Sequence, residues 1–299
     1  MSTETVDPRF VDIDLWSTEA AVAAMLEGQL TAIAAVQAQV HAIARASDAA
    51  AARLMQGGRL VYVGAGTSGR IAVQDGVELS PTFDWPSERI VFLMAGGADA
   101  LTESAEGAED NAVSGRAEII AAGIGPFDVV IGVAASGRTP YTVAAVEAAR
   151  AMGALTLGIA NNPGSALLTA AEHPILIDTG SELIAGSTRM KAGTAQKAVL
   201  NLFSTATMLR CGRVYKGLMV NMRISNEKLL KRGQDMVRQF ADVAPDVAVA
   251  ALDAAGRDIK VAVLIATGTD AATASELLRR NHDNLRAAIA DRAGAPHAG

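Results

Sequence analysis

The sequence is poor in the residues on which several kinds of site depend. Among its 299 residues it has a single cysteine, Cys211, so it can form no internal disulfide and no thiolate metal site. Its four histidines lie far apart in the sequence, at His41, His173, His282 and His297. Such scatter argues against a zinc site and against a Ser-His-Asp triad. We therefore expect no metal.

Positive charge and long apolar runs are also scarce. The sequence has 26 Lys and Arg against 32 Asp and Glu, a net charge of −6, which argues against nucleic-acid and anionic-membrane partners. Its longest apolar stretches, such as VAVLIATG at 261–268, fall far short of a membrane span. The acidic start MSTETVDPRFVDIDLW lacks the basic and apolar regions of a signal peptide. We expect a cytoplasmic protein that binds anions through a local cluster of donors.

The apolar residues follow two different periods. Residues 17–56 have helical spacing, and five short β-rich runs follow, separated by segments long enough for helices. These runs are RLVYVG, RIVFLMAG, FDVVIGVAAS, ALTLGIAN and PILIDTG. Alternating strands and helices predict a doubly wound α/β fold with a mostly parallel sheet. We divide the chain into an N-terminal helical segment, 1–56, a sheet domain, 57–224, and a small C-terminal helical domain, 225–299.

The stretch LVYVGAGTSGR at 60–70 joins the first β-rich run to a predicted helix. Gly64, Gly66 and Gly69 spell G-x-G-x-x-G, a turn that directs backbone N–H groups and a positive helix end toward an anion. A dinucleotide site also needs an acidic residue at the tip of the second strand. Here that strand ends in the uncharged sequence MAGG. The pattern therefore disfavours a nicotinamide cofactor, and we expect no cofactor.

Two more hydroxyl-rich loops follow later β-rich runs, in VVIGVAASGRTPY and GSELIAGSTRMKAGTAQK. Because the carboxyl ends of parallel strands meet at one edge, these loops predict a pocket for a sugar phosphate. The predicted binding residues are Gly66, Thr67, Ser68, Ser136, Gly137, Arg138, Thr139, Glu182, Ser187, Thr188 and Lys191. For Glu182 two interpretations stay open, a contact with the sugar ring and a solvent-exposed turn residue.

GAGTSGR, ASGRTPY and GSTRMKAGTAQK together resemble the sugar-isomerase (SIS) fold. With EGAED and NEKL in the same order, the sequence resembles the N-acetylmuramic acid 6-phosphate etherases over nearly its whole length. Where that family reads close to D-A-S-E-C-P-P-T, this sequence reads DGVELSPT and keeps Asp75, Glu78, Pro81 and Thr82. The resemblance implies a lyase, without metal or cofactor, that forms a homodimer in which the partner chain closes each active site.

The reaction that the resemblance implies cleaves the C3 ether between lactate and the sugar. One group takes the C2 proton, another protonates the departing lactate, and water then adds at C3. The products are N-acetylglucosamine 6-phosphate and D-lactate. Matched to the family's catalytic pair, Glu109 is the expected base and Glu78 the expected acid. Glu78 lies near the predicted end of a helix stopped by Pro81, where the negative end of the dipole favours a neutral side chain.

Two other functions fit the same loops. An aldose–ketose sugar-phosphate isomerase on this fold would use a glutamate base but would need no acid at C3. A non-enzymatic sugar-phosphate sensor would usually carry a DNA-binding segment, and no basic helix-turn-helix precedes the sheet. The presence of both Glu78 and Glu109 favours the etherase over these alternatives.

Overall fold

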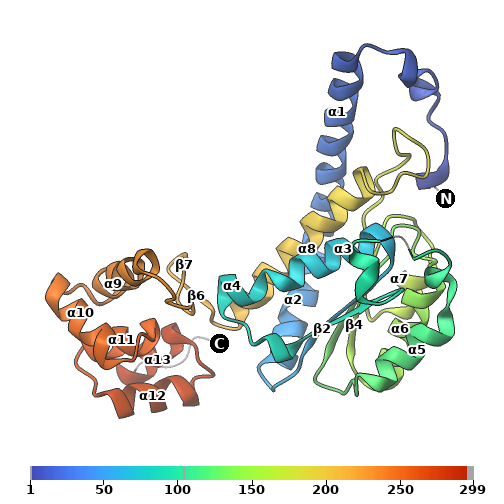
Figure 1. Cartoon of the computed structure of the whole chain (residues 1–299). Coiled ribbons are helices and arrows are strands. Elements are labelled where there is room, and N and C mark those ends of the chain that lie inside the picture. The colour runs from blue at the N-terminus through green and yellow to red at the C-terminus, as the bar shows by residue number, and fades with distance from the viewer. Residues whose placement is uncertain (1, 104, 295–299) are drawn as a thin grey trace. The chain divides into compact units, whose positions relative to one another are not determined.

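The computed structural model describes residues 2–103 and 105–294, which form two compact units (Figure 1). The first, the sheet unit, comprises residues 1–77 and 87–206, and the second, the helical unit, comprises residues 78–86 and 207–299. The domain boundaries expected at 56/57 and 224/225 stay predictions.

The sheet unit is built on a parallel sheet of five strands in the order β2-β1-β3-β4-β5. The strands are β1 (Leu60–Gly64), β2 (Ile90–Met94), β3 (Val129–Val133), β4 (Leu155–Ala160) and β5 (His173–Leu176). They confirm the five predicted β-rich runs and the doubly wound α/β fold. The strand order reverses at β1, since β2 lies on one side of it and β3 on the other. In such sheets ligands bind at this reversal, beyond the carboxyl ends of the strands.

Helices cover both faces of this sheet (Figure 1). One face packs against α5 (Ala112–Ala121), α6 (Pro140–Ala151) and α7 (Ala166–Ala170). The other lies under α2 (Val40–Leu54), α3 (Gly66–Val77) and α8 (Lys191–Arg210). Packing is close because many facing residues are small. Gly132 on β3, for example, leaves no room for a Cβ atom beside Val146 and Leu167.

Short 3₁₀ helices complete the unit: η1 (Ser2–Glu4), η2 (Pro8–Phe10), η3 (Ile13–Leu15), η4 (Gln37–Gln39), η5 (Ser87–Arg89), η6 (Ala98–Leu101) and η7 (Ala108–Asp110). The long helix α1 (Thr18–Val36) begins at Ser17, whose Oγ accepts a hydrogen bond from the N–H of Ala20 at 3.2 Å. Through η4 it continues into α2, as the predicted helix over 17–56 requires.

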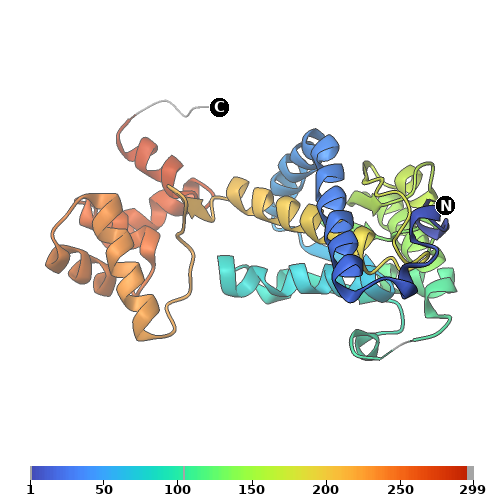
Figure 2. The same ribbon diagram turned by 90° about the horizontal axis from the view of Figure 1, so that it is seen from above.

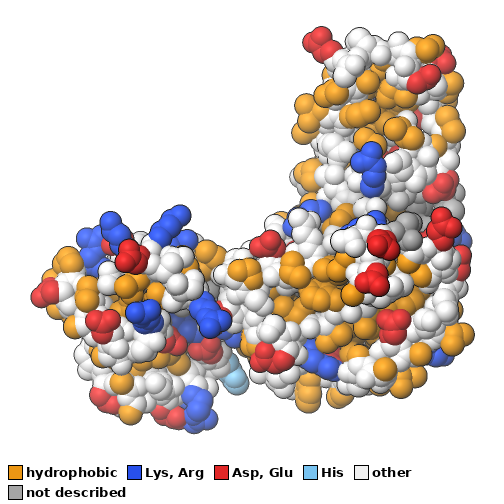
Figure 3. Space-filling model, viewed as in Figure 1, with side chains coloured by type: hydrophobic (Ala, Val, Ile, Leu, Met, Phe, Trp, Pro, Cys, Tyr) orange, Lys and Arg blue, Asp and Glu red, His pale blue; other side chains and the backbone are white. Residues whose placement is uncertain are grey.

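One face of α1, continuing to the first residue of α2, is apolar and exposed, and Figure 3 shows hydrophobic side chains along α1. This α1 stripe consists of Val22, Leu26, Leu30, Ile33 and Val40, each about half exposed. By length and composition alone, the helical stretch Thr18–Leu54 could cross a membrane, since it contains an 18-residue segment with a mean hydropathy of 1.3. The sequence pattern did not reveal this because alanines and single polar residues interrupt every run of large apolar side chains.

The helical unit contains α4 (Leu79–Phe83), β6 (Val214–Tyr215), β7 (Leu218–Met219), α9 (Glu227–Ala241), α10 (Pro245–Ala254), α11 (Ile259–Ala266), α12 (Ala271–Arg280) and α13 (Leu285–Arg292). It has its own apolar core, in which α11 buries most of the VAVLIATG patch. The β6–β7 hairpin was not predicted. Its turn residues Lys216 and Gly217 both have positive φ, at 47° and 79°, as a type I′ turn requires. Lysine rarely occupies such a position, so the sequence offered no clear turn signal.

Candidate active site

The first glycine-rich loop connects β1 to α3. Gly66 begins the helix with φ +51°, a conformation that favours glycine. A Cβ atom at Gly69 would lie 2.9 Å from the carbonyl carbon of Gly64, so glycine is needed for the helix to approach the strand this closely. Thr67 and Ser68 stand in the first turn of α3, where N–H groups lack partners within the helix. This end of α3 is therefore suited to an anion.

The second loop follows β3 and leads into α6. Gly137 has φ +61°, and a Cβ atom there would collide with the side chain of Ser165. The Oγ of Ser136 accepts a hydrogen bond from the N–H of Arg138 at 3.1 Å, which holds the turn. Thr139 is the N-cap residue of α6, and Pro140 follows at the first helical position, where no N–H is required.

The third loop precedes α8 and is organised around Glu182. This side chain is completely buried, and its two carboxylate oxygens accept hydrogen bonds from the N–H groups of Lys191 and Ala192, at 2.9 Å each. The Nζ of Lys191 donates to the carbonyl oxygen of Ser181 at 2.9 Å. Glu182 is thus not an exposed turn residue, and its contact with the sugar stays a prediction. It caps α8, since the first N–H groups of a helix need acceptors.

The three loops surround one cavity of about 340 Å³ at the point where the strand order reverses. Hydroxyl side chains from all three line it: Thr67, Ser68, Ser136, Thr139 and Thr188. Of the other predicted binding residues, Gly66 also lines the cavity, whereas Gly137, Arg138, Glu182, Ser187 and Lys191 do not. The structure therefore brings together the hydroxyls and helix N-termini expected of a phosphate site, and the binding roles of the individual residues stay predictions.

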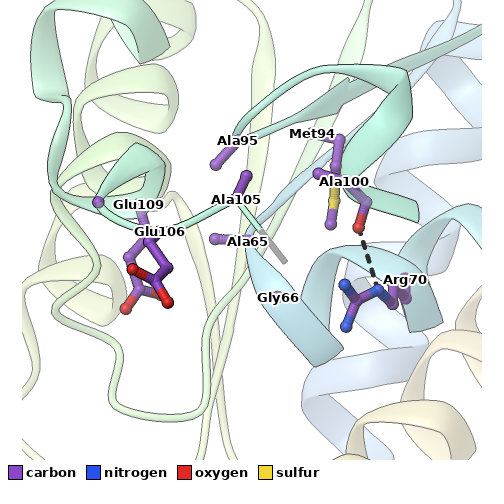
Figure 4. A pocket seen from close by; sticks show the side chains of 10 residues that line it. Ala65, Gly66, Arg70, Met94, Ala95, Ala100, Ala105, Glu106 and Glu109 are labelled. Atoms are coloured by element: carbon purple, nitrogen blue, oxygen red, sulfur yellow. Dashed lines mark hydrogen bonds between the residues drawn. The ribbon is translucent and has the colours of Figure 1, made fainter. Parts of the chain in front are cut away.

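Glu109, on η7, lines this cavity and also an adjoining one of about 360 Å³. In Figure 4 the side chains of Glu109 and Glu106 project to the same side. Arg70 lines the adjoining cavity and donates from Nε to the carbonyl oxygen of Ala100 at 3.1 Å (Figure 4). It also donates to the carbonyl of Glu103 at 2.8 Å. Arg70 therefore anchors the loop that follows β2, and this loop leads to η7, which carries Glu109.

Glu78 stands at the other end of α3. It is exposed, links α3 directly to α4, and lines neither of the two cavities that Glu109 lines. Since α3 has 12 residues, its two ends are about 18 Å apart. Pro81 does not stop the helical course as predicted but lies in the first turn of α4, where proline is tolerated.

A buried network fixes α3 against its neighbours. Asp75 is 3% exposed, and its carboxylate accepts hydrogen bonds from the Tyr62 hydroxyl on β1 at 3.1 Å and the Ser204 hydroxyl on α8 at 3.2 Å. Burial raises the pKa of Asp75 above its usual value, and burial and the neighbouring carboxylate raise the pKa of Tyr62 well above its own. The network ties together β1, α3 and α8, which all lead to the cavity.

Sequence reasoning missed the N-terminal segment, which runs back to the third loop (Figures 1 and 2). Thr3 is completely buried, its carbonyl accepts from the N–H of Gly186 at 3.0 Å, and its hydroxyl accepts from Asn162 at 3.1 Å. The next residue, Glu4, lines the hydroxyl-rich cavity. Polar termini are usually frayed, so nothing in MSTETV by itself indicated this placement.

Known proteins resemble this chain over most of its length. Residues 42–150 match the glucokinase regulatory protein N-terminal SIS domain, and residues 113–206 match the SIS domain. The N-acetylmuramic acid 6-phosphate etherase of Deinococcus radiodurans is 49% identical over 277 residues, which are 92% of this chain and 91% of that protein. The chain belongs to the N-acetylmuramic acid 6-phosphate etherase family. The etherase of Streptomyces coelicolor is 47% identical over 292 residues, or 97% and 94% of the two chains.

Membership of the etherase family confirms the family resemblance drawn from the loop motifs. Among solved structures, a phosphoheptose isomerase from Francisella tularensis is similar, with a TM-score of 0.46 and 18% identity. The similarity covers 65% of this chain and 98% of that one.

Proposed function

We propose that this chain, as an etherase, cleaves the C3 D-lactyl ether of N-acetylmuramic acid 6-phosphate. The products are N-acetylglucosamine 6-phosphate and D-lactate, so the chain is a carbon–oxygen lyase of amino-sugar catabolism. The observation that supports this most is the cavity itself. Glu109 faces a space lined by hydroxyls of three loops, at the end of the sheet where ligands bind in such folds.

The hydroxyl-rich end of the cavity holds the phosphate. Among the described residues that line it there is no lysine or arginine, so the anion is held by neutral donors and by helix N-termini. These donors are the hydroxyls of Thr67, Ser68, Ser136 and Thr139 with the nearby backbone N–H groups. Each charge-assisted hydrogen bond contributes roughly 1.5–3 kcal/mol to binding.

The carboxylate of Glu109 then removes the C2 proton of the open-chain sugar, which the C1 aldehyde acidifies. The resulting enolate expels the lactate oxygen from C3, and Glu78 protonates that oxygen as it leaves. Water adds to C3 of the unsaturated aldehyde and restores a hydroxyl there. The reaction needs one base and one acid, and we assign these roles to Glu109 and Glu78.

The active enzyme is a homodimer in which the partner chain supplies Glu78. The length of α3 supports this, because it keeps Glu78 about 18 Å along the helix from the loop that lines the cavity. The exposed α1 stripe provides an apolar surface that a second copy covers, rather than a membrane. The enzyme is cytoplasmic, where a charged sugar phosphate that cannot cross a membrane unaided is retained.

The test of the reaction is incubation with N-acetylmuramic acid 6-phosphate and an assay for D-lactate. We expect lactate and N-acetylglucosamine 6-phosphate in equal amounts. A rearranged sugar phosphate without lactate would favour the isomerase, and tight binding without turnover would favour the sensor.

The test of the shared site mixes two inactive variants, Glu78→Gln and Glu109→Gln, refolded together so that subunits exchange. If each site takes one glutamate from each chain, random pairing restores about a quarter of the wild-type sites. If both glutamates came from the same chain, no mixed dimer would hold an intact pair, and activity would stay absent.

A further inference from the structure

Glu4 brings a second carboxylate to the hydroxyl-rich cavity, and it does so from the N-terminal segment. Glu4 and Glu109 are the acidic residues among the described residues that line this cavity. The Oε2 atom of Glu4 lies 2.9 Å from the position that a Cβ atom would take at Gly186, so the carboxylate rests against the third loop. Gly186, with φ +77°, leaves the room that this contact needs.

The segment that carries Glu4 is held firmly to the loops of the cavity. The side-chain amide of Asn162 donates both to the hydroxyl of Thr3, at 3.1 Å, and to the carbonyl oxygen of Ala135, at 2.9 Å. Ala135 itself lines the cavity in the second loop. Farther along, a carboxylate oxygen of Asp7 accepts from the Ser181 hydroxyl at 3.4 Å. The position of Glu4 is therefore fixed by its buried neighbour Thr3, which is connected to the second loop through Asn162 and to the third loop through Gly186.

The chemistry of a carboxylate limits what Glu4 can contact. An ionised carboxylate only accepts hydrogen bonds, and it repels a phosphate at close range. Its partner in the cavity must therefore be a donor on the part of the ligand away from the phosphate. In a phosphorylated 2-acetamido sugar these donors are the ring or chain hydroxyls and the amide N–H.

We propose that Glu4 accepts a hydrogen bond from a hydroxyl or amide N–H of the sugar and so orients it between the phosphate-binding loops and Glu109. The identity of the sugar in this inference rests on the proposed function. It assigns to the N-terminal segment one wall of the substrate site. Glu4 is a substrate-binding residue and takes no part in proton transfer.

The experiment compares Glu4→Ala and Glu4→Gln with a matched control, Asp12→Asn. Asp12 is an exposed acid of the same segment and is not among the residues that line the cavity. We expect Glu4→Ala to weaken binding of N-acetylglucosamine 6-phosphate by roughly tenfold to a hundredfold, measured by calorimetry. Glu4→Gln, which keeps the shape and one acceptor oxygen, should lie between the wild type and Glu4→Ala. Asp12→Asn should bind like the wild type.

Inorganic phosphate, as a competing ligand, separates orientation from loss of structure. Its affinity should be unchanged or slightly higher in both Glu4 variants, since Glu4 does not contact the phosphate and its negative charge is gone. Equal weakening of phosphate and sugar phosphate would show that the loops had loosened, and it would overturn the inference, as would wild-type sugar binding by Glu4→Ala. Lactate release by the wild type tests the proposed function separately, because the binding comparison does not depend on turnover.

Discussion

The two ends of α3 differ in what surrounds them. At the first end, Gly66, Thr67 and Ser68 meet the second and third loops around one cavity. At the other end, Glu78 is exposed and lines neither cavity that Glu109 lines. The first end is placed by the sheet, whose parallel strands all bring their following loops to one edge. The catalytic role that we propose for Glu78, at the far end of the same helix, therefore depends on the proposed homodimer.

The largest expected effect distinguishes the two glutamates. Glu109→Gln should abolish both lactate release and exchange of the C2 proton with solvent deuterium, because the base is gone. Glu78→Gln should lose lactate release yet keep C2 exchange, because the enolate forms without the acid. Loss of a positioned acid or base typically costs about 10²–10⁴ in rate, so NMR of the C2 signal in deuterated buffer can resolve the two patterns.

Glu106→Gln is the control for this pair, since Glu106 lines only the adjoining cavity and should retain exchange and lactate release. Exchange lost only in Glu78→Gln would reverse the two roles. Full lactate release from both variants would contradict the mechanism.

A smaller effect is expected at the phosphate end of the cavity. Ser136→Ala removes a hydroxyl that lines it and should raise KM for the phosphorylated sugar by about tenfold. Ser187→Ala is the matched comparison, because Ser187 was also a predicted binding residue but does not line the cavity. Steady-state kinetics on both variants shows whether the cavity or the sequence motif better identifies the contacts. A KM unchanged by Ser136→Ala would exclude the second loop from phosphate binding.

The capping role of Glu182 predicts an effect on stability. Glu182→Ala leaves the N–H groups of Lys191 and Ala192 without their buried acceptor. The free energy of unfolding should fall by roughly 1–3 kcal/mol, measured by urea denaturation. Glu19→Ala, an exposed acid in the first turn of α1, should change it by less than about 0.5 kcal/mol. Equal stability of the two variants would mean that the cap contributes nothing.

The smallest effect concerns Asp75 and depends on pH. Burial raises the pKa of Asp75 in the folded chain, so the folded state binds this proton more tightly than the unfolded state. The stabilisation is fully present below the unfolded pKa and is lost as the pH rises through the folded one. Relative to Asp75→Asn, the wild type should therefore gain stability when urea denaturation is moved from about pH 7.5 to about pH 5. A difference that does not change with pH would show that Asp75 is ionised in the folded protein.

Much of the fold followed from local patterns in the sequence. The five strands were predicted because short β-rich runs alternate with helical segments along the chain. This alternation depends on the local sequence and not on which strands pair with one another. The first loop was predicted from its G-x-G-x-x-G pattern, and the structure shows why glycine is needed there: Gly66 has a positive φ, and Gly69 lies close to Gly64 of β1. The β6–β7 hairpin escaped because its turn uses Lys216 where asparagine or aspartate is usual.

The sequence by itself determined which loops follow the strands, and hence that hydroxyls and helix N-termini gather at one edge of a parallel sheet. Only the tertiary structure decided which of these side chains face the cavity. The buried side chain of Glu182 caps α8. Glu4 lines the cavity although it precedes α1 in the sequence and is distant from all three loops along the chain. The physical reason is that strands and glycine turns are set by neighbouring residues, whereas the position of a carboxylate depends on which backbone and side-chain groups the folded chain brings next to it.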